Sequence, residues 1–182
     1  MPSATFYVVR HAHAVWQPDE QQRLSAQGRR DAERVANLLH TFPVAAVYAS
    51  PYPRAAETVE PLARRLGHPV RIEDGLRERR LSAGCVPDFE RAVRRAWEHP
   101  DDALPGGEPN RVARERVLAV VERLRARHPN EHLALGTHGS LMALLLHHFD
   151  SRFGFADWER MSMPDVYRLG PEGTVNRLWG EG

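Results

Sequence analysis

The amino-acid sequence predicts an α/β fold with a mostly parallel central sheet. Short apolar segments of strand length alternate along the chain with amphipathic helical segments, which is the pattern of strand–helix–strand units. At 182 residues, of which 42% are hydrophobic, the chain is long enough to bury one sizeable core. We therefore expect a single domain over residues 1–182, with one insertion that interrupts the alternation.

Three strands and two helices are expected in the first half of the chain. Aromatic and β-branched residues at 6–9 predict a buried strand, and Ser25 is a suitable N-cap for the helix behind it. Pro61 lies inside the second helical pattern and is expected to kink that helix. In order, the elements are a strand at 6–9, a helix from 25 to about 41, a strand at 44–49, a helix ending before Gly67 and a strand at 70–72.

The second half begins with a less regular stretch, residues 79–110, which we interpret as a short helical lid inserted into the domain. Alternation then resumes, and the chain ends in two strand-like runs around a Gly-Pro-Glu-Gly sequence, which is a hairpin signal. The expected elements are a lid helix at 87–98, a helix from 113 to about 128, a strand at 133–137, a helix at 141–148 and a hairpin of 166–169 with 175–179.

All 25 basic residues are arginines, and this composition excludes chemistry that depends on lysine. A Walker-A phosphate loop, a Schiff base and a Ser-x-x-Lys nucleophile pair are ruled out, so an anion must be held by Arg, His or backbone N–H groups. The arginines are interleaved with 24 acidic residues to a net charge of +1, which indicates solvated helix faces and no nucleic-acid partner.

The sequence predicts a cytoplasmic protein without a membrane partner. Its single cysteine excludes an intrachain disulfide, no signal peptide is recognisable, and no apolar stretch reaches membrane-spanning length. The C-terminal hairpin offers an edge strand with which a second copy could pair, so a homodimer stays open beside a monomer.

Polar residues follow the expected strands at the edge where parallel α/β sheets bind their ligands. Arg10 and His11 follow the first strand, and His138 follows a later one. Arg54 begins the helix after the second strand, and Glu78 comes shortly after the third. Two histidines, two arginines and one carboxylate suit phosphoryl transfer, which needs a nucleophile, planar cations and an acid for the leaving group.

Two other chemistries fit the sequence less well. His11 and His13 have the spacing of paired metal ligands, but the further ligands of such sites are missing, so we expect no metal. Cys85 and Arg91 have the Cys-x5-Arg spacing of a cysteine phosphatase loop, but a proline, two carboxylates and no glycine lie between them. An anion cradle needs free N–H donors and no acid, so we reject this loop.

Six motifs in a fixed order resemble the histidine phosphatase superfamily, also called the phosphoglycerate mutase-like family. The motifs are Arg10-His11-Ala12, Leu24-Ser25-Ala26-Gln27-Gly28, the set Ser50, Pro51, Arg54, Ala55 and Thr58, then Leu76 with Glu78, Pro105-Gly106-Gly107-Glu108, and His138-Gly139. The resemblance covers residues 6 to about 146. It implies a three-layer α/β/α sandwich with a mostly parallel central sheet and a short helical lid insertion.

The resemblance also implies a role for each residue of the expected site. His11 would be the nucleophile that forms a phosphohistidine, and Glu78 would protonate the leaving alkoxide and later activate water. Arg10, Arg54 and His138 would complete the phosphate pocket and stabilise charge during the transfer. No metal or other cofactor is implied, and the ligand would be a small phosphorylated substrate or inorganic phosphate.

Four further residues belong to the expected substrate site. Gln17 stands where many family members have an asparagine that contacts phosphate, and Gly139 follows the second histidine. Arg79 and Arg80 either line the substrate entrance or belong to a solvated loop. Ala12 replaces the family's usual glycine after the nucleophile, where only a small residue fits.

The sequence favours hydrolysis over isomerisation, because family members that are true mutases usually carry a longer insertion after the residue equivalent to Glu78. We therefore expect a metal-independent phosphomonoesterase that hydrolyses a small phosphorylated metabolite through a phosphohistidine intermediate. A phosphoglycerate mutase and a non-catalytic domain that binds a phosphorylated ligand are the alternatives. A protein phosphatase acting on phosphohistidine fits less well, because such proteins are usually shorter.

Overall fold

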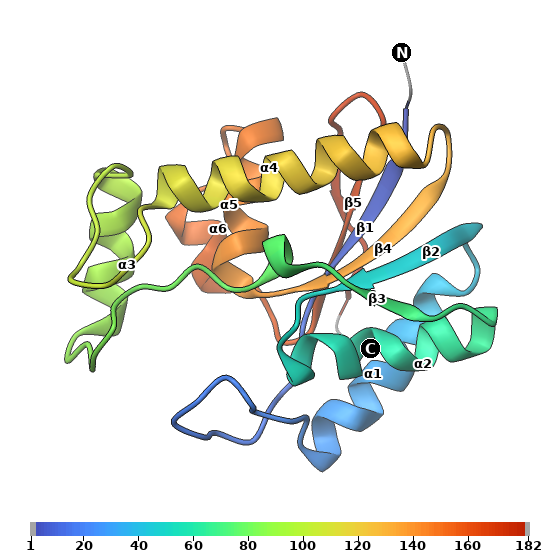
Figure 1. The fold of residues 1–182 in the computed structure, drawn as a ribbon, viewed down its shortest axis with the longest axis horizontal. Coiled ribbons are helices and arrows are strands. Elements are labelled where there is room, and N and C mark those ends of the chain that lie inside the picture. Colours follow the sequence, from blue (N-terminus) through green and yellow to red (C-terminus); the bar gives the residue numbers. More distant parts are fainter. Residues whose placement is uncertain (1–2, 181–182) are drawn as a thin grey trace.

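A six-stranded sheet lies between two layers of helices in the computed structural model, which describes residues 3–180 (Figure 1). Across the sheet, the strands are β3 (Val70–Ile72), β2 (Val44–Ala49), β4 (His132–Thr137), β1 (Thr5–Arg10), β5 (Asp165–Leu169) and β6 (Val175–Arg177). The first four are parallel, whereas β5 and β6 are antiparallel to their neighbours. The expected α/β sandwich with a mostly parallel sheet is therefore confirmed.

Helices cover both faces of the sheet (Figure 1). Those on one face are α1 (Ala26–Leu39) and α2 (Pro53–Leu66), and those on the other are α4 (Asn110–Arg127), α5 (Gly139–Phe149) and α6 (Phe155–Arg160). The remaining helix, α3 (Phe89–Glu98), stands beyond the end of α4 and contacts α6 rather than the sheet. No helix within residues 3–180 is both long enough and apolar enough to cross a membrane.

The central strand β1 contributes to two separate hydrophobic cores. Phe6 and Val8 pack with α4 and α5, whereas Tyr7 and Val9 point to the opposite face and pack with α1 and α2. All four side chains are fully buried. Burial on both faces explains why this strand is an unbroken apolar run in the sequence instead of an alternating one.

The register of the parallel strands brings their carboxyl ends to one edge of the sheet. Arg10 of β1 pairs with Thr137 of β4, so His11 and His138 leave the sheet as neighbours. β2 pairs with β4 up to Ala49, the last residue of β2, opposite Gly136, which places the start of α2 at the same edge. The edge expected to bind a ligand is therefore assembled from β1, β2 and β4.

Pro61 lies inside α2, which continues to Leu66, so the kink expected there stays a prediction. Two local features differ from the expectations. The first helix ends at Leu39, slightly before the expected position near 41. A short helix, α6, was not expected, because six residues are too few to show a helical period in the sequence.

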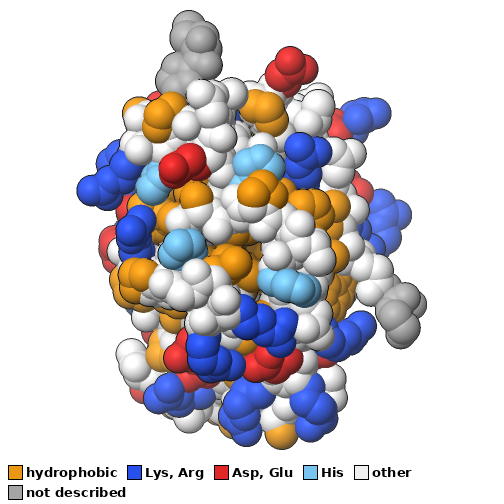
Figure 2. Space-filling model, turned by 90° about the vertical axis from the view of Figure 1, so that its right-hand side faces the viewer, with side chains coloured by type: hydrophobic (Ala, Val, Ile, Leu, Met, Phe, Trp, Pro, Cys, Tyr) orange, Lys and Arg blue, Asp and Glu red, His pale blue; other side chains and the backbone are white. Residues whose placement is uncertain are grey.

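The opposite edge of the sheet carries the amino ends of the strands. Figure 2 views the molecule from this side, where histidine side chains are scattered among hydrophobic and arginine side chains. Nδ1 of His132 forms a hydrogen bond of 2.9 Å with the Tyr7 hydroxyl, and Nε2 of His128 forms one of 2.9 Å with the Tyr48 hydroxyl. Within the described residues, no group of three or more His, Cys, Asp or Glu side chains could hold a metal ion, on this edge or elsewhere.

Candidate active site

The two histidines expected at the site meet where β1 and β4 end. The centroids of the His11 and His138 rings are 5.3 Å apart, and the ring planes are inclined by 63°. His11 is 9% exposed and His138 is fully buried. The parallel strand pair therefore holds two imidazoles together in a nearly water-free position, although their chemical roles remain predictions.

The hydrogen bond of His11 determines which of its nitrogens is available for reaction. Its Nδ1 lies 2.8 Å from the carbonyl oxygen of Ala12, and because a carbonyl only accepts, Nδ1 must carry the proton. The lone pair is then on Nε2. Burial, together with the positive charges of Arg54 and Arg10, lowers the pKa of His11 to about 3. His11 is consequently neutral near pH 7, with a nucleophilic Nε2.

His138 is also held in its neutral form. Its Nε2 lies 2.7 Å from the Ser50 hydroxyl, and its Nδ1 is buried without a hydrogen-bond partner among residues 3–180. Burial lowers the pKa of His138 well below its usual value, and the charges of Arg54 and Arg10 act in the same direction. A buried polar atom without a partner is unusual in a folded protein and requires an explanation, for which a bound ligand is one candidate.

Arg10 is fixed by the loop that precedes β5. Its Nη1 donates to the carbonyl oxygens of Met161 at 3.0 Å and Ser162 at 3.3 Å, while its buried Nε has no partner in the described chain. Burial lowers the pKa of Arg10, an effect opposed by the charges of Glu78 and Asp165. The guanidinium is therefore oriented by neutral acceptors and keeps a donor free for an anion.

Gly139 gives the Arg10 guanidinium the space it occupies. A Cβ atom at Gly139 would lie 2.9 Å from Nε and 3.0 Å from Cζ of Arg10. Any larger residue at this position would displace the guanidinium. The glycine of the His-Gly motif thus contributes by allowing α5 to begin directly against Arg10.

Arg54 begins α2 and carries an ion pair that sequence reasoning missed. It is 7% exposed, and its Nη2 lies 3.2 Å from the carboxylate of Glu20, whose side chain is 57% exposed. Glu20 belongs to the irregular segment between β1 and α1, where no periodicity or motif distinguishes it. Its carboxylate is a negative charge next to the Arg54 guanidinium, which is expected to bind phosphate.

Glu78 is anchored at the amino end of α5. Its Oε1 accepts from the backbone N–H of Arg79 at 2.8 Å and of Leu141 at 2.9 Å, and its Oε2 accepts from that of Ser140 at 3.1 Å. A carboxylate offers about four lone-pair positions, so these three bonds leave room for one more donor. The side chain is held in one place and keeps one acceptor position free.

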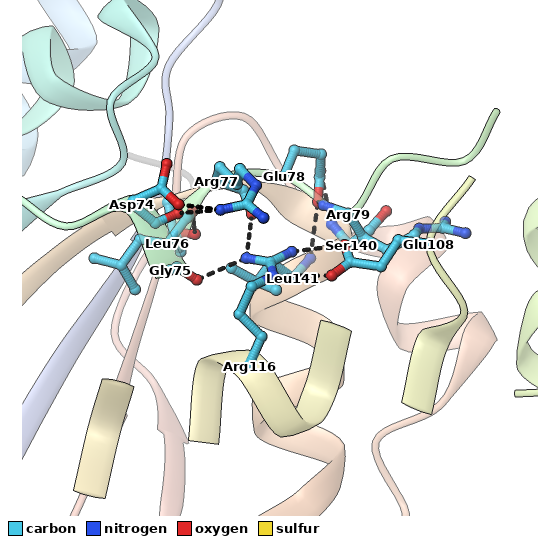
Figure 3. A network of polar contacts seen from close by, with 11 residues as sticks. Asp74, Gly75, Leu76, Arg77, Glu78, Arg79, Glu108, Arg116, Ser140 and Leu141 are labelled. Carbon is cyan, nitrogen blue, oxygen red and sulfur yellow. Dashed lines mark hydrogen bonds and ion pairs between the residues drawn. The ribbon is translucent and has the colours of Figure 1, made fainter. Parts of the chain in front are cut away.

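Arg116 holds the segment that leads to Glu78, as Figure 3 shows. Its Nη1 donates to the carbonyl oxygens of Gly75 at 2.7 Å and Arg77 at 3.0 Å. The rest of its guanidinium forms a two-pronged ion pair with Glu108, at 2.9 Å and 2.7 Å. Glu108 closes the Pro-Gly-Gly-Glu motif, so that motif supports Glu78 indirectly. Sequence reasoning did not single out Arg116.

Two other motifs fasten the loop that follows His11. The Thr58 hydroxyl accepts from the backbone N–H of Ala12 at 2.9 Å and donates to the Arg54 carbonyl at 2.7 Å. A Cβ atom at Gly28 would lie 2.0 Å from the carbonyl oxygen of His13, so only glycine allows this loop to touch α1. These motif residues position the histidine and arginine side chains without entering the site.

A cleft of about 890 Å³ opens beside Arg54 and Glu78. Arg79 and Arg80 also line it; Arg79 is only 4% exposed and its Nε has no partner within residues 3–180, whereas Arg80 is exposed. Gln17 does not line the cleft, and its carbonyl oxygen accepts from the Gln22 side chain. Of the four expected substrate residues, the structure brings three to the site and leaves Gln17 outside it.

The first prediction concerns the protonation of His11. Its pKa of about 3 lies below the ordinary value of 6.5, so an unfolded chain binds a proton here between these values and the folded chain does not. The free energy of unfolding should therefore fall as the pH is lowered through this window, and part of the loss should disappear in His11→Gln. In NMR spectra, the imidazole signal of His11 is the one that wild type shows and His11→Gln lacks. In a titration of wild type, this signal should keep its chemical shift down to about pH 4. A midpoint near 6.5 would contradict the assignment.

The second prediction concerns Glu20. Because its carboxylate competes for Arg54, Glu20→Gln should lower the inhibition constant of inorganic phosphate by about twofold to fivefold, as expected for a partly exposed ion pair. Asp19→Asn is the matched control, since Asp19 lines the same cleft but accepts from the backbone of Gln21. Equal inhibition constants for Glu20→Gln and Asp19→Asn would show that the ion pair does not oppose phosphate binding.

Comparison with known proteins identifies the family of the chain. Residues 6–173 match the model of the histidine phosphatase superfamily, branch 1. The chain is 27% identical over 197 residues to phosphoglycerate mutase-like protein 4 of Arabidopsis thaliana, and the alignment covers 98% of this chain and 85% of that protein.

Solved structures have the same fold at low sequence identity. A mycobacterial glucosyl-3-phosphoglycerate phosphatase in complex with VO3 superposes with a TM-score of 0.77 at 24% identity, covering 98% of this chain and 99% of the other. A phosphoglycerate mutase from Thermus thermophilus superposes with a TM-score of 0.71 at 22% identity, covering 97% and 99%. Because the family model spans nearly the whole chain, the protein belongs to the histidine phosphatase superfamily.

Proposed function

We propose that the protein is a metal-independent phosphomonoesterase that transfers the phosphoryl group of its substrate to Nε2 of His11 and then to water. The observation that carries the proposal is the hydrogen bond from His11 Nδ1 to the Ala12 carbonyl, which leaves a neutral histidine with its lone pair on Nε2. A neutral nucleophile close enough to Arg54 and Arg10 to be affected by their positive charges suits attack on a negatively charged phosphoryl group.

In the first step, Nε2 of His11 attacks phosphorus while the bond between phosphorus and the ester oxygen breaks. Glu78, in its protonated form, gives its proton to the departing oxygen, so the alcohol leaves neutral. Arg10 Nε and Arg54 donate to the phosphoryl oxygens, where negative charge is spread in the transition state. His138 adds a donor when the proton of its neutral ring is on the unpartnered Nδ1.

In the second step, water attacks the phosphohistidine. The Glu78 carboxylate takes a proton from this water, the new bond to phosphorus forms and the bond to Nε2 breaks, which restores neutral His11 and releases inorganic phosphate. The same carboxylate therefore acts as acid and then as base. Its three backbone N–H donors keep it in position between the two steps.

Two alternatives remain for the activity of this site. A phosphoglycerate mutase would use the same phosphohistidine but return the phosphoryl group to a second hydroxyl, and one similar solved structure is such a mutase. The phosphatase is favoured by the short insertion at 79–110, the proposed lid, and by similarity to a glucosyl-3-phosphoglycerate phosphatase. A non-catalytic phosphate-binding domain would not need the neutral nucleophile and the anchored carboxylate together.

The third prediction tests the two chemical roles together. With a chelator present, wild type should hydrolyse 4-nitrophenyl phosphate, and His11→Ala should lower kcat by at least about a thousandfold. Glu78→Gln should reduce turnover of an alkyl phosphate far more than that of 4-nitrophenyl phosphate, because nitrophenolate leaves without a proton. His40→Ala, which changes an exposed histidine at the C-terminal end of α1, should match wild type.

Each role has its own contradictory outcome. Loss of activity with chelator would rule out the metal-free mechanism, and an active His11→Ala would rule out the nucleophile. An equal effect of Glu78→Gln on both esters would remove the proton-donor role. Exchange of phosphate between the two phosphoglycerates by wild type would favour the mutase.

A further inference from the structure

Two large aromatic side chains are exposed inside the cleft that leads from the phosphate-binding residues. Trp16 is 78% exposed and comes from the segment between β1 and α1, whereas Phe89 is 55% exposed and begins α3. The two residues are far apart in the sequence but line the same cleft. Exposed aromatic surface in a concave site is a common feature of ligand recognition.

The wall between these aromatic residues carries no charge. Residues 81–86 are Leu, Ser, Ala, Gly, Cys and Val, and all six line the cleft. This wall is fixed to the Pro-Gly-Gly-Glu loop, because Ala83 donates to the Pro105 carbonyl at 3.0 Å and Glu108 donates to the Arg80 carbonyl at 2.7 Å. The cleft therefore has a stable neutral side in addition to its charged end at Arg54 and Glu78.

Phe89 is supported from behind by a second aromatic cluster. Its ring centroid lies 6.3 Å from that of Trp158 on α6, and Trp158 lies 5.4 Å from Phe155. The guanidinium of Arg94 covers Phe155 at 4.3 Å from the ring centroid. These contacts attach α3 to α6, so the position of Phe89 at the cleft is determined by packing rather than by a free loop.

The size of the cleft also exceeds what a phosphoryl group needs. Its volume is about 890 Å³, which is in the range of pockets that enclose ligands of many atoms. Because the phosphoryl group is accounted for at the charged end, the remaining space faces the group that leaves when the ester is cleaved. Tyr52 joins the two parts, since it lines the cleft and its ring centroid is 5.2 Å from that of His138.

We infer that the substrate is a phosphate monoester whose leaving group carries an aromatic ring, and that this ring contacts Trp16 and Phe89. The inference rests on the proposed phosphatase function and specifies its substrate class. Aromatic faces pack well against other planar rings. An uncharged leaving group also loses little hydration free energy when it binds against the neutral residues 81–86. The aromatic pair then determines specificity, while the histidine site determines reactivity.

The competing substrate class has a second negative charge on the leaving group. Arg79 and Arg80 also line the cleft and would be its partners. Arg79, however, is 4% exposed and lies beside the carboxylates of Glu78 and Glu108, whose charges it already feels. Arg80 is exposed, but the exposed carboxylates of Asp19 and Glu20 line the same cleft and oppose a second anion, so the aromatic pair favours the ring.

The inference is tested by binding, so that leaving-group reactivity plays no part. Three phosphonates that cannot be hydrolysed are compared by calorimetry: naphthylmethylphosphonate, ethylphosphonate and 3-phosphonopropionate, which carries a second anion. Wild type should bind the naphthyl compound at least about tenfold more tightly than ethylphosphonate. Phe89→Ala and Trp16→Ala should each lose about fivefold on the naphthyl compound and less than about twofold on ethylphosphonate.

Two further variants make this result specific. Phe89→Tyr keeps the ring and should restore naphthyl binding, whereas Ile72→Ala, which removes an exposed apolar side chain outside this cleft, should behave as wild type. Equal affinity of wild type for the naphthyl and ethyl compounds would overturn the inference, as would tightest binding of 3-phosphonopropionate. Either result in a protein that still hydrolyses 4-nitrophenyl phosphate would leave the phosphatase proposal standing. Preference for the naphthyl compound in a protein that does not hydrolyse 4-nitrophenyl phosphate would support the aromatic ligand and overturn the phosphatase proposal.

Discussion

The parallel pairing of β1 with β4 is the constraint on which the rest of the site depends. Its register places Arg10 opposite Thr137, and the next residue on each strand is a histidine. A shift of one residue would turn Phe6 and Tyr7 to the wrong faces and separate the two rings. Burial of apolar side chains on both faces of β1 thus fixes the relative position of His11 and His138. A direct hydrogen bond between the two histidines is not needed to keep them in place.

The electrostatic character of the site follows from burying cations beside neutral imidazoles. Arg10 and Arg54 are both largely withdrawn from water, and their charges help to keep His11 unprotonated. Arg10 donates to neutral carbonyl oxygens, and Arg54 pairs with the exposed side chain of Glu20. Neither arrangement compensates the buried positive charge as fully as a dianionic phosphoryl group would. The fold therefore maintains a site that is complementary to an anion and holds a neutral histidine in it.

Much of this arrangement could be predicted from the sequence, because strand ends and motif spacing are local signals. The apolar run at 6–9 and the motif residues Arg54 and Glu78 placed the site at the correct edge of the sheet. The supporting contacts were beyond such signals: Arg116 reaches Glu108 and the segment before Glu78 only in three dimensions. Glu20 lies in an irregular loop, where side-chain direction depends on tertiary packing and not on periodicity. For the same reason, the position of Gln17 outside the cleft could not be anticipated.

The motif residues fall into two groups, those that shape the loops and those that can contact a ligand. Thr58, Gly28 and Glu108 touch backbone or other side chains and shape the loops, whereas His11, Arg10 and Arg54 present atoms that can meet a ligand. Residues of the first kind act by holding those of the second. The aromatic side chains of Trp16 and Phe89 and the neutral stretch at 81–86 belong to neither group, and on them rests the proposal about the substrate class.

In the proposed mechanism, His11 Nε2 attacks phosphorus while Arg10, Arg54 and His138 surround the transferred group. A crystal structure of the protein with vanadate is the sharpest test of this arrangement, because vanadate adopts the geometry of the transition state. We expect vanadium bonded to Nε2 of His11, its equatorial oxygens held by the two guanidinium groups and His138, and its opposite apical oxygen facing Glu78. Vanadate bonded to another residue, or bound without a bond to His11, would rule out this mechanism.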